Sequence, residues 1–281
     1  MIEETWATPD GEVLFTDPAQ VSRALAQLAC GFWYRWAWEK VRKGGPDEEW
    51  MTARAWWASE VRKFLSGYDL PPLGLDSDKL LFDAAMKKNE QLPASLIEAG
   101  LNWAPIKDRW RVDYGGRRDA RTIPVQAVWV SEFLIDDALA WAEAQGEPVL
   151  LWYSHRALEQ AFKRRQGLTV YDPRNSPPQE RKARVPRIAA ASITAHGTGR
   201  NLQHGWGNQL VTSAFSSHGK WEQLLGRTHR TGQRRGEVKC SINVHTPKLM
   251  ASWDKAVARS ARSESLGGGD RKLLLATILE E

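Results

Sequence analysis

The sequence predicts an α/β fold, with a mostly parallel β-sheet in the second half of the chain and a tryptophan-rich helical region before it. Three observations support this prediction. After residue 146, short apolar runs alternate with helical segments, the pattern of a parallel sheet covered by helices. Eleven of the 15 tryptophans precede that point, where apolar residues recur at helical spacing. The charge divides there as well: residues 1–146 carry 17 basic and 23 acidic side chains, whereas residues 147–281 carry 22 and 11.

Two helices are predicted near the start of the chain, over residues 18–42 and 47–65. Apolar side chains recur three and four positions apart in both segments, as in a helix with one buried face. Between them, Gly44, Gly45 and Pro46 interrupt the pattern, because glycine frees the backbone and proline disrupts helical hydrogen bonds.

The tryptophans of this region have two interpretations. Several of them, such as Trp33, Trp36 and Trp38, are interleaved with arginine and lysine, as are aromatic side chains that stack on nucleic-acid bases. Tryptophan at helical spacing is, however, typical of a buried core, so we assign these residues to the core. Residues 71–121 contain paired prolines, paired glycines and many charges, and predict a connecting region with short helical pieces such as 78–89.

The second half of the chain predicts the sheet. We place the domain boundary between Trp129 and Gly146, which gives a helical region over 1–145, a sheet domain over 146–265 and a C-terminal tail helix over 266–281. Strands are expected at 148–153, 168–171, 188–193, 209–214 and 237–244, and helices at 131–145, 156–165, 218–227, 247–262 and from residue 270. In this architecture, ligands bind on the loops at the carboxyl ends of the strands.

Composition narrows the classes of protein to consider. No segment reaches the roughly 18 consecutive apolar residues that a membrane span needs, and residues 1–12 do not resemble a signal peptide, so we expect a cytoplasmic protein without a membrane partner. Cys30 and Cys240 lie far apart, and no CxxC or Cys/His cluster is present, which indicates neither a disulfide framework nor a metal site.

The charge of the second half suggests a class of partner. With 22 basic and 11 acidic residues, it has a net charge of +11, which favours a polyanion such as a nucleic-acid backbone. A solvated basic surface explains the same charge without a partner. The placement of individual arginines is therefore more informative than their number.

The segment from Gln223 to Gln233 carries two arginines, Arg227 and Arg230, where a predicted helix meets a loop. Side chains three residues apart lie on one helical face, so both guanidinium groups can reach a single phosphate. Phosphoryl transfer is catalysed largely by positioning and charge stabilisation, and an arginine finger requires this geometry. A basic surface helix explains the same spacing.

The pattern Gln-x-x-Gly-Arg-x-x-Arg-x-Gly-Gln closely resembles motif six of superfamily 2 helicases, in particular their Snf-type (Swi/Snf-like) branch. The resemblance implies that the sheet domain is the second, C-terminal RecA-like lobe of such an enzyme. It further implies that Arg227 and Arg230 contact the γ-phosphate of ATP, and that Gln223 links the nucleotide to the opposing lobe. Gly226, within the same motif, is implied to lie at the nucleotide.

A second segment, from Ser192 to Gln203, combines glycines with short hydrogen-bonding side chains directly after a strand. A tight turn alone explains its Gly-x-Gly. The segment resembles motif five of the same family, with Arg200 where leucine is common. Three side chains are implied to face the nucleic-acid backbone: Thr194, His196 and Thr198. Two residues are implied to lie by the nucleotide: Gly199 and Asn201.

A third match is the strand that ends in Ser154, His155 and Arg156, which is similar to motif four. Polar side chains at the end of a strand can bind phosphates, although a helix N-cap explains Ser154 equally well. The resemblance implies that these three residues contact nucleic acid. The three motifs occur in the family's order within residues 146–249.

An ATPase of this class also needs a phosphate-binding loop ending in Gly-Lys-Ser/Thr and an acidic box for Mg²⁺, and neither occurs in the 281 residues. The resemblance therefore implies half of a catalytic site, in a split or truncated DNA helicase or translocase. The compact, minimal lobe suggests a phage or bacterial origin. ATP and Mg²⁺ would be held mainly by a first RecA-like lobe on another polypeptide. We expect DNA as the nucleic acid, with RNA as an alternative, and no ATP hydrolysis by this chain alone.

Two other functions remain open. The lobe could be a non-catalytic module that binds nucleic acid or regulates a helicase. The tryptophan-rich half could be a protein-interaction module that dominates the function. Arg227 and Arg230 discriminate the first of these from the enzyme, because only the enzyme needs them for ATP hydrolysis.

Overall fold

The computed structural model describes residues 7–11, 15, 18–38, 45–67, 84–88, 91–113, 125–179, 184–233, 235–267 and 271–275. Its helices are α2 (Pro18–Leu28), α3 (Glu48–Ser66), α5 (Ala94–Asp113), α6 (Phe133–Ala144), α7 (Arg156–Lys163), α8 (Ile193–His196), α9 (His218–Thr228), α10 (Pro247–Gly267) and α11 (Lys272–Leu275). Its strands are β1 (Phe32–Trp36), β2 (Val125–Trp129), β3 (Val149–Tyr153), β4 (Thr169–Tyr171), β5 (Ile188–Ser192), β6 (Asn208–Val211) and β7 (Lys239–Ile242). The chain divides into two compact units: unit 1 comprises residues 1–34 and 127–281, and unit 2 comprises residues 35–126.

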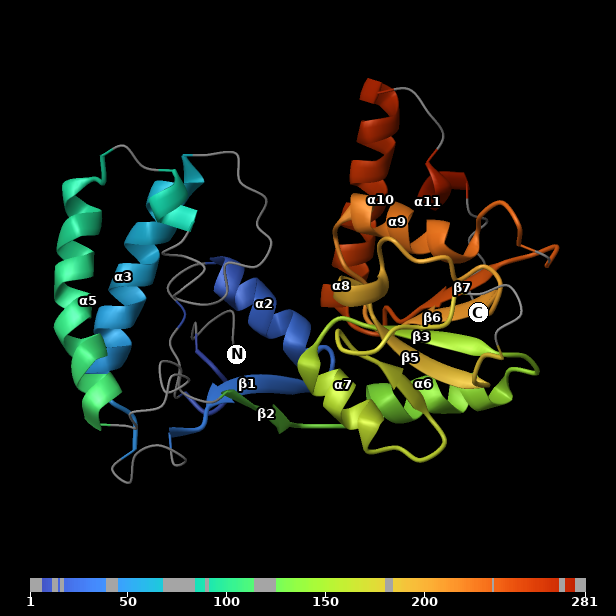
Figure 1. The fold of residues 1–281 in the computed structure, drawn as a ribbon, viewed down its shortest axis with the longest axis horizontal. Coiled ribbons are helices and arrows are strands. Elements are labelled where there is room, and N and C mark those ends of the chain that lie inside the picture. Colours follow the sequence, from blue (N-terminus) through green and yellow to red (C-terminus); the bar gives the residue numbers. More distant parts are fainter. Residues whose placement is uncertain are drawn as a thin grey trace. The chain divides into compact units, whose positions relative to one another are not determined.

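Unit 1 is built on a five-stranded sheet with the order β4-β5-β3-β6-β7 (Figure 1). Every neighbouring pair is parallel, and β3 lies at the centre, with Val149 opposite Ile188 of β5 and Asn208 of β6. The prediction of an α/β fold with a parallel sheet is therefore confirmed. The five strands expected from the sequence all form, although β6 and β7 end earlier than their apolar runs suggest.

Strand β3 separates two hydrophobic cores, because successive side chains of a strand point to opposite faces. Val149 and Leu151 belong to a core that α6 and α7 cover. Leu150 and Trp152 belong to a core on the other face, which α9, α10 and α11 cover. Burial on both faces explains why β3 consists of five consecutive apolar residues, all buried.

The first predicted helix is shorter than expected and is followed by a strand. Helix α2 ends at Leu28, and Gly31 then adopts a φ of +87°, so a Cβ at this position would lie 2.1 Å from the carbonyl oxygen of Ser131. Only glycine fits this turn. The aromatic residues that follow form β1, which pairs with β2, and the predicted helix over 18–42 is therefore corrected to a helix and a strand.

Unit 2 contains α3 and α5, which pack on each other. Helix α3 confirms the prediction over 47–65 and begins at Asp47, whose carboxylate accepts a hydrogen bond from the Trp50 amide at 3.0 Å. Helix α5 is a correction, because it lies in the segment expected to be a connecting region. The predicted helical piece over 78–89 lies mostly outside the described residues.

Four tryptophans of unit 2 form its core, as expected, whereas Trp56, which was assigned to the core with them, is 39% exposed. Trp38, Trp50, Trp57 and Trp103 are each at most 4% exposed. Trp38 packs edge to face on Trp50 at 5.5 Å between ring centroids, whereas Trp57 stacks on Trp103 at 6.1 Å. The edge-to-face arrangement is favourable because the positive edge of one ring meets the negative face of the other.

The compact units do not follow the chain order of the expected domains. Residues 1–34 and 127–145, which we assigned to the helical region, fall in unit 1 with the sheet. None of the described helices has the length and hydropathy needed to cross a lipid bilayer.

Candidate functional site

The residues of the motif-four segment follow the central strand β3 and differ in exposure. Ser154 and Arg156 are exposed, and the Ser154 hydroxyl lies 3.3 Å from the hydroxyl of Ser213, which follows β6. The ring of His155 is half-buried, 5.5 Å from that of Phe32 between centroids, and burial lowers the pKa of His155 to about 4. His155 is therefore neutral near pH 7 and packs against the protein rather than offering a charge.

The helix N-cap considered for Ser154 does not form. The N-cap residue of α7 is His155, and its side chain makes no capping bond. Instead, the Ala157 amide donates to the hydroxyl of Tyr34 at 3.0 Å. Tyr34 has no signal in the local sequence, because it lies more than 100 residues away. The Ser154 hydroxyl thus remains exposed at the carboxyl end of β3.

The motif-five segment starts with α8, directly after β5. Thr194, Thr198 and Gly199 are exposed, and Gly199 has a φ of +70° that favours glycine. His196 differs from the expectation: it is 1% exposed, and its Nε2 lies 2.9 Å from the carbonyl oxygen of Asp172. Because a carbonyl only accepts, this nitrogen carries the proton. His196 thus lies inside the protein and is not placed to contact a nucleic-acid backbone.

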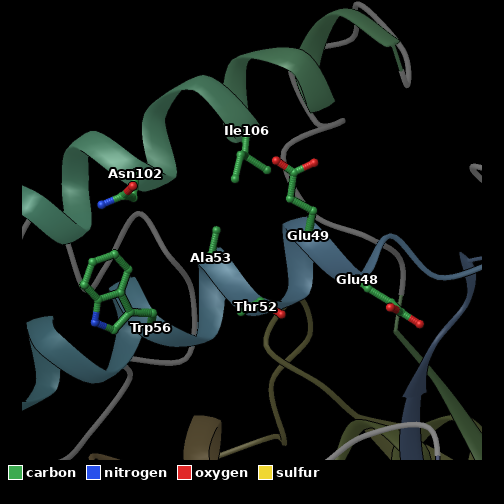
Figure 2. A pocket seen from close by; sticks show the side chains of 7 residues that line it. All are labelled: Glu48, Glu49, Thr52, Ala53, Trp56, Asn102 and Ile106. Carbon is green, nitrogen blue, oxygen red and sulfur yellow. The ribbon is translucent and has the colours of Figure 1, made fainter.

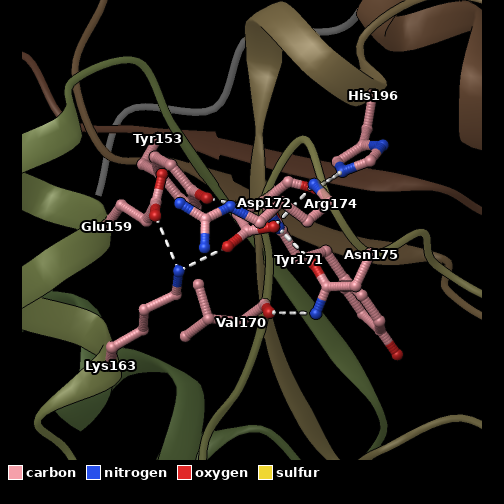
Figure 3. A network of polar contacts seen from close by, with 9 residues as sticks. All are labelled: Tyr153, Glu159, Lys163, Val170, Tyr171, Asp172, Arg174, Asn175 and His196. Atoms are coloured by element: carbon pink, nitrogen blue, oxygen red, sulfur yellow. Dashed lines mark hydrogen bonds and ion pairs between the residues drawn. The ribbon is translucent and has the colours of Figure 1, made fainter. Parts of the chain in front are cut away.

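A polar network anchors His196 to the turn after β4 (Figure 3). Lys163 donates to the carboxylates of Glu159 and Asp172, and Asp172 also accepts from the Arg174 amide at 2.7 Å. These hydrogen bonds, with the Lys163 interaction the largest, lower the pKa of Asp172. The turn that holds His196 is therefore fixed by charge-assisted bonds, and α8 is fixed with it.

Arg227 connects the motif-six helix to the motif-five loop. Its Nε donates to the carbonyl oxygen of Gly197 at 3.1 Å, and one terminal nitrogen donates to that of Arg200 at 3.2 Å. A backbone hydrogen bond joins the same two segments, because the Leu202 amide donates to the Arg227 carbonyl oxygen at 3.2 Å. The two segments that the sequence presents separately thus form one surface.

Arg230 extends this surface towards solvent. It is exposed, and one terminal nitrogen donates to Oδ1 of Asn201 at 2.7 Å. Partial burial, with a smaller effect of the Arg230 charge, lowers the pKa of Arg227, although arginine stays protonated at physiological pH. Among the described residues, no carboxylate forms a salt bridge with either arginine. Two adjacent positive charges therefore lie beside neutral acceptors only, which is an arrangement that attracts an anion.

The other two motif-six residues lie on the same helix. Gln223 is exposed, and its carbonyl oxygen accepts from Nε of Arg227 at 3.1 Å. A Cβ at Gly226 would meet only the Lys272 side chain, at an ordinary 3.8 Å. The packing of the described residues therefore does not require glycine at position 226.

A buried hydrogen-bonded chain supports the end of α9. The Trp152 indole donates to Oε1 of Gln209, and Nε2 of Gln209 donates to the Thr228 hydroxyl, both at 2.9 Å. All three side chains are fully buried. The sequence did not predict this support, although one signal was present: β6 begins with two polar residues, Asn208 and Gln209, and is buried along its whole length. The chain links the central strand to the turn that carries Arg227 and Arg230.

The arrangement as a whole is suited to binding an anion. Arg227 comes from the last turn of α9 and Arg230 from the turn after it, and the loop that starts at Gly197 supplies polar groups beside them. Within the described residues, no group of three or more His, Cys, Asp or Glu is arranged to hold a metal ion.

Unit 2 contains a groove of its own, between α3 and α5 (Figure 2). It has a volume of about 450 Å³ and is lined by Glu48, Glu49, Thr52, Ala53, Trp56, Asn102 and Ile106. None of the residues predicted to bind nucleotide or nucleic acid lies there, and we assign the groove no function.

In comparisons with known proteins, the chain matches no protein-family model and no curated protein. The assignment that stands on the structure is an α/β unit with a five-stranded parallel sheet.

Proposed function

We propose that unit 1 is the second lobe of a superfamily 2, Snf-type nucleic-acid-dependent ATPase. In this proposal it binds DNA and supplies Arg227 and Arg230 as arginine fingers to an ATP held by a first lobe outside these 281 residues. The observation that carries the proposal is the contact between the two arginines and the loop from Gly197 to Asn201, with no carboxylate salt-bridged to either arginine in the described part of the chain.

The two arginines have different roles in this proposal. Arg227 is held by carbonyl oxygens against the motif-five loop, so its guanidinium group is already fixed in place before a phosphate binds. Arg230 is exposed and bonded only through one terminal nitrogen, so its guanidinium group can turn towards a phosphate. A guanidinium suits this purpose because its planar donors match phosphate oxygens.

The DNA contacts belong to the carboxyl ends of β3 and β5, which are neighbours in the sheet. Ser154 and Arg156 follow β3, and Thr194 and Thr198 follow β5; all four are exposed. Hydroxyl and guanidinium groups are common phosphate ligands in protein–DNA complexes. His155 and His196 are omitted from the proposed contacts, because both pack within unit 1.

The bound ATP and Mg²⁺ supply the γ-phosphoryl group and its charge-neutralising cation. The residues of this chain supply positive charge where negative charge develops, and closure of the two lobes would exclude water from that position. Because no Gly-Lys-Ser/Thr loop occurs in the sequence, hydrolysis would require the first lobe.

A reconstitution experiment tests the proposal. The chain is mixed with a first lobe that carries the Gly-Lys-Ser/Thr loop and acidic box, taken from the neighbouring gene, and ATP hydrolysis is measured with and without DNA. We expect hydrolysis only in the mixture, and Arg230→Ala to lower kcat by at least about 10³-fold, the usual effect of losing an arginine finger. DNA affinity should change by less than about threefold, because a single exposed contact contributes little to it.

Arg164→Ala provides the matched control, because Arg164 is also exposed but is paired with Glu132. It should leave kcat unchanged. If the mixture binds DNA but never hydrolyses ATP, the ATPase proposal fails, and a non-catalytic nucleic-acid-binding module becomes the better explanation.

A further inference from the structure

Helix α10 carries four basic residues on one face, which we call the α10 basic stripe: Lys248, Lys255, Arg259 and Arg262. They are spaced by seven, four and three residues. At 3.6 residues per turn, these spacings keep all four within an arc of about 60° around the helix axis. The stripe extends over about 21 Å, given a rise of about 1.5 Å per residue.

Three of the four charges in the stripe are available to a ligand. Lys255, Arg259 and Arg262 are exposed, and none of them forms a salt bridge within the described part of the chain. Arg259 donates from one terminal nitrogen to the carbonyl oxygen of Ser216 at 3.3 Å, which orients its guanidinium but leaves other donors unused. Lys248 is half-buried and donates to the Ser22 hydroxyl at 2.6 Å.

The acidic residues of α10 do not neutralise the stripe. Asp254 and Glu264 lie on the helix at angles of roughly 100° or more from the stripe centre, calculated from the helical period. Glu264 is also engaged elsewhere, because its carboxylate accepts from the Arg271 amide at 3.2 Å. The positive charges of the stripe therefore stand without a carboxylate on their own face.

The other side of α10 holds the stripe in place. Leu249, Ala256 and Ser260 are at most 1% exposed. Helix α10 packs against α9 and α11 (Figure 1). A membrane-surface helix needs a free apolar face to enter the lipid, and the apolar face of α10 is already used by the core. A polyanion that stays in water therefore fits the stripe better than a lipid surface does.

The length of the stripe suits a nucleic-acid backbone. From Lys255 to Arg262 the helix rises about 10.5 Å, and a DNA duplex presents one phosphate per about 3.4 Å of axis on each strand, so about three phosphates face three cations. We propose that the α10 basic stripe binds the sugar-phosphate backbone of nucleic acid without reading its sequence. The proposal shares its partner with the proposed ATPase but requires neither ATP nor Arg227 and Arg230.

The salt dependence of DNA binding tests this proposal with the full chain. Binding of a fluorescently labelled 20-base-pair duplex is followed by anisotropy at several salt concentrations. The test variant combines Lys255→Gln, Arg259→Gln and Arg262→Gln. Since each lost phosphate contact reduces the slope of log K against log salt by about 0.9, we expect the slope to fall by about 2.7. Affinity at 0.1 M salt should fall on the order of 100-fold.

A second triple variant controls for the loss of net charge. It combines Arg62→Gln, Lys63→Gln and Lys107→Gln, three exposed cations of unit 2. If the α10 basic stripe binds DNA, this variant should change the slope of log K against log salt by less than one third of the change in the stripe variant. Circular dichroism of both variants should match that of the unchanged chain, because all six side chains are exposed.

Several results would overturn the proposal. Equal losses in the two triple variants would mean that only the overall charge matters, and an unchanged slope in the stripe variant would mean that α10 does not touch DNA. Loss of binding to phosphatidylserine vesicles, with DNA binding retained, would assign the stripe to a membrane instead. If the stripe variant leaves the slope unchanged while Arg230→Ala still abolishes reconstituted hydrolysis, only the stripe proposal fails. If the stripe variant lowers the slope but Arg230→Ala does not affect hydrolysis, only the ATPase proposal fails.

Discussion

Arg227 and Arg230 lie one turn apart, yet their surroundings give them different physical properties. Arg227 is half-buried and donates to three carbonyl oxygens, whereas Arg230 is exposed and bonds one amide oxygen. Lysine could not replace Arg227, because a single ammonium cannot span the carbonyls that the planar guanidinium reaches. The motif therefore combines a structural arginine with an accessible one.

Two histidines, the half-buried His155 and the buried His196, make the stability of unit 1 depend on pH. Burial lowers the pKa of His155 from 6.5 to about 4 and lowers the pKa of His196 as well. Between these values the unfolded chain binds more protons than the folded one, so the contribution of His155 is complete above about pH 6.5 and is lost as the pH falls towards 4. We therefore expect the urea concentration at the midpoint of unfolding to be lower at pH 5 than at pH 7.5.

His155→Gln should reduce that fall, because glutamine does not titrate. The urea midpoint of each variant at the two pH values provides the measurement. His229→Gln is the control for exchanging a histidine for glutamine, since His229 is exposed. If His155→Gln retains the full pH dependence of the unchanged chain, burial of His155 is not its cause.

The sequence was informative about the residues of the site and less so about their surroundings. The spacing of Arg227 and Arg230 predicted that they share a helical face, but α9 ends at Thr228, so only Arg227 is helical and Arg230 lies in the turn that follows. The burial of His196 could not be predicted, because it depends on Asp172, a residue 24 positions away in the turn after another strand. The local sequence does not predict contacts between residues so far apart in the chain.

Among the elements, α11 illustrates how a short helix can be held by one carboxylate. The two oxygens of Glu222, on α9, accept from the amides of Lys272 and Leu273 at 2.9 and 3.0 Å, and Leu273 is 3% exposed. The first amides of a helix have no partner within it, so this carboxylate replaces an N-cap. The C-terminal helix thus lies beside the turn that carries the motif-six arginines.

We expect Glu222→Gln to detach α11 while leaving the sheet folded. Glutamine offers one acceptor and no charge, and a hydrogen bond to a charged group contributes about 1.5–3 kcal/mol. Hydrogen exchange of the peptide covering residues 271–275 should therefore accelerate by at least about tenfold. Glu237→Gln, which removes only an exposed ion pair with Lys239, should not change it. Unchanged protection in Glu222→Gln would mean that the apolar contacts of Leu273 suffice.

The success of prediction differed between elements for physical reasons. Strand β3 was predictable because burial on both faces demands an uninterrupted apolar run. Strand β1 was missed because its aromatic residues continue the helical spacing of α2, and the break depends on Gly31 meeting Ser131, which is distant in sequence. Helix α5 was missed because its sequence contains Pro105 and lacks a clear apolar face.

At the scale of the whole molecule, the sequence has an acidic first half and a basic second half, but the two compact units do not differ in this way. Unit 1 contains 23 basic and 20 acidic residues, and unit 2 contains 16 and 14. An acidic residue before the sheet lies close to basic residues between its strands: Glu132 pairs with both Arg164 and Arg165, which lie between β3 and β4. The proposal of a polyanionic partner therefore rests on where cations without a salt bridge among the described residues lie, at the end of α9, in the turn after it and along α10, rather than on net charge.

The most direct test of the central claim is a titration of the chain with pyrophosphate, followed by NMR of the arginine Nε–H groups. Signals of Arg227 and Arg230 would be assigned from the variants Arg227→Lys and Arg230→Lys. The account predicts that these two signals shift together and saturate with one dissociation constant, while those of Arg164 and Arg165, paired with Glu132, stay in place. If Arg227 and Arg230 do not move, or move only as much as the paired arginines, the two residues do not form a phosphate site and the account is contradicted.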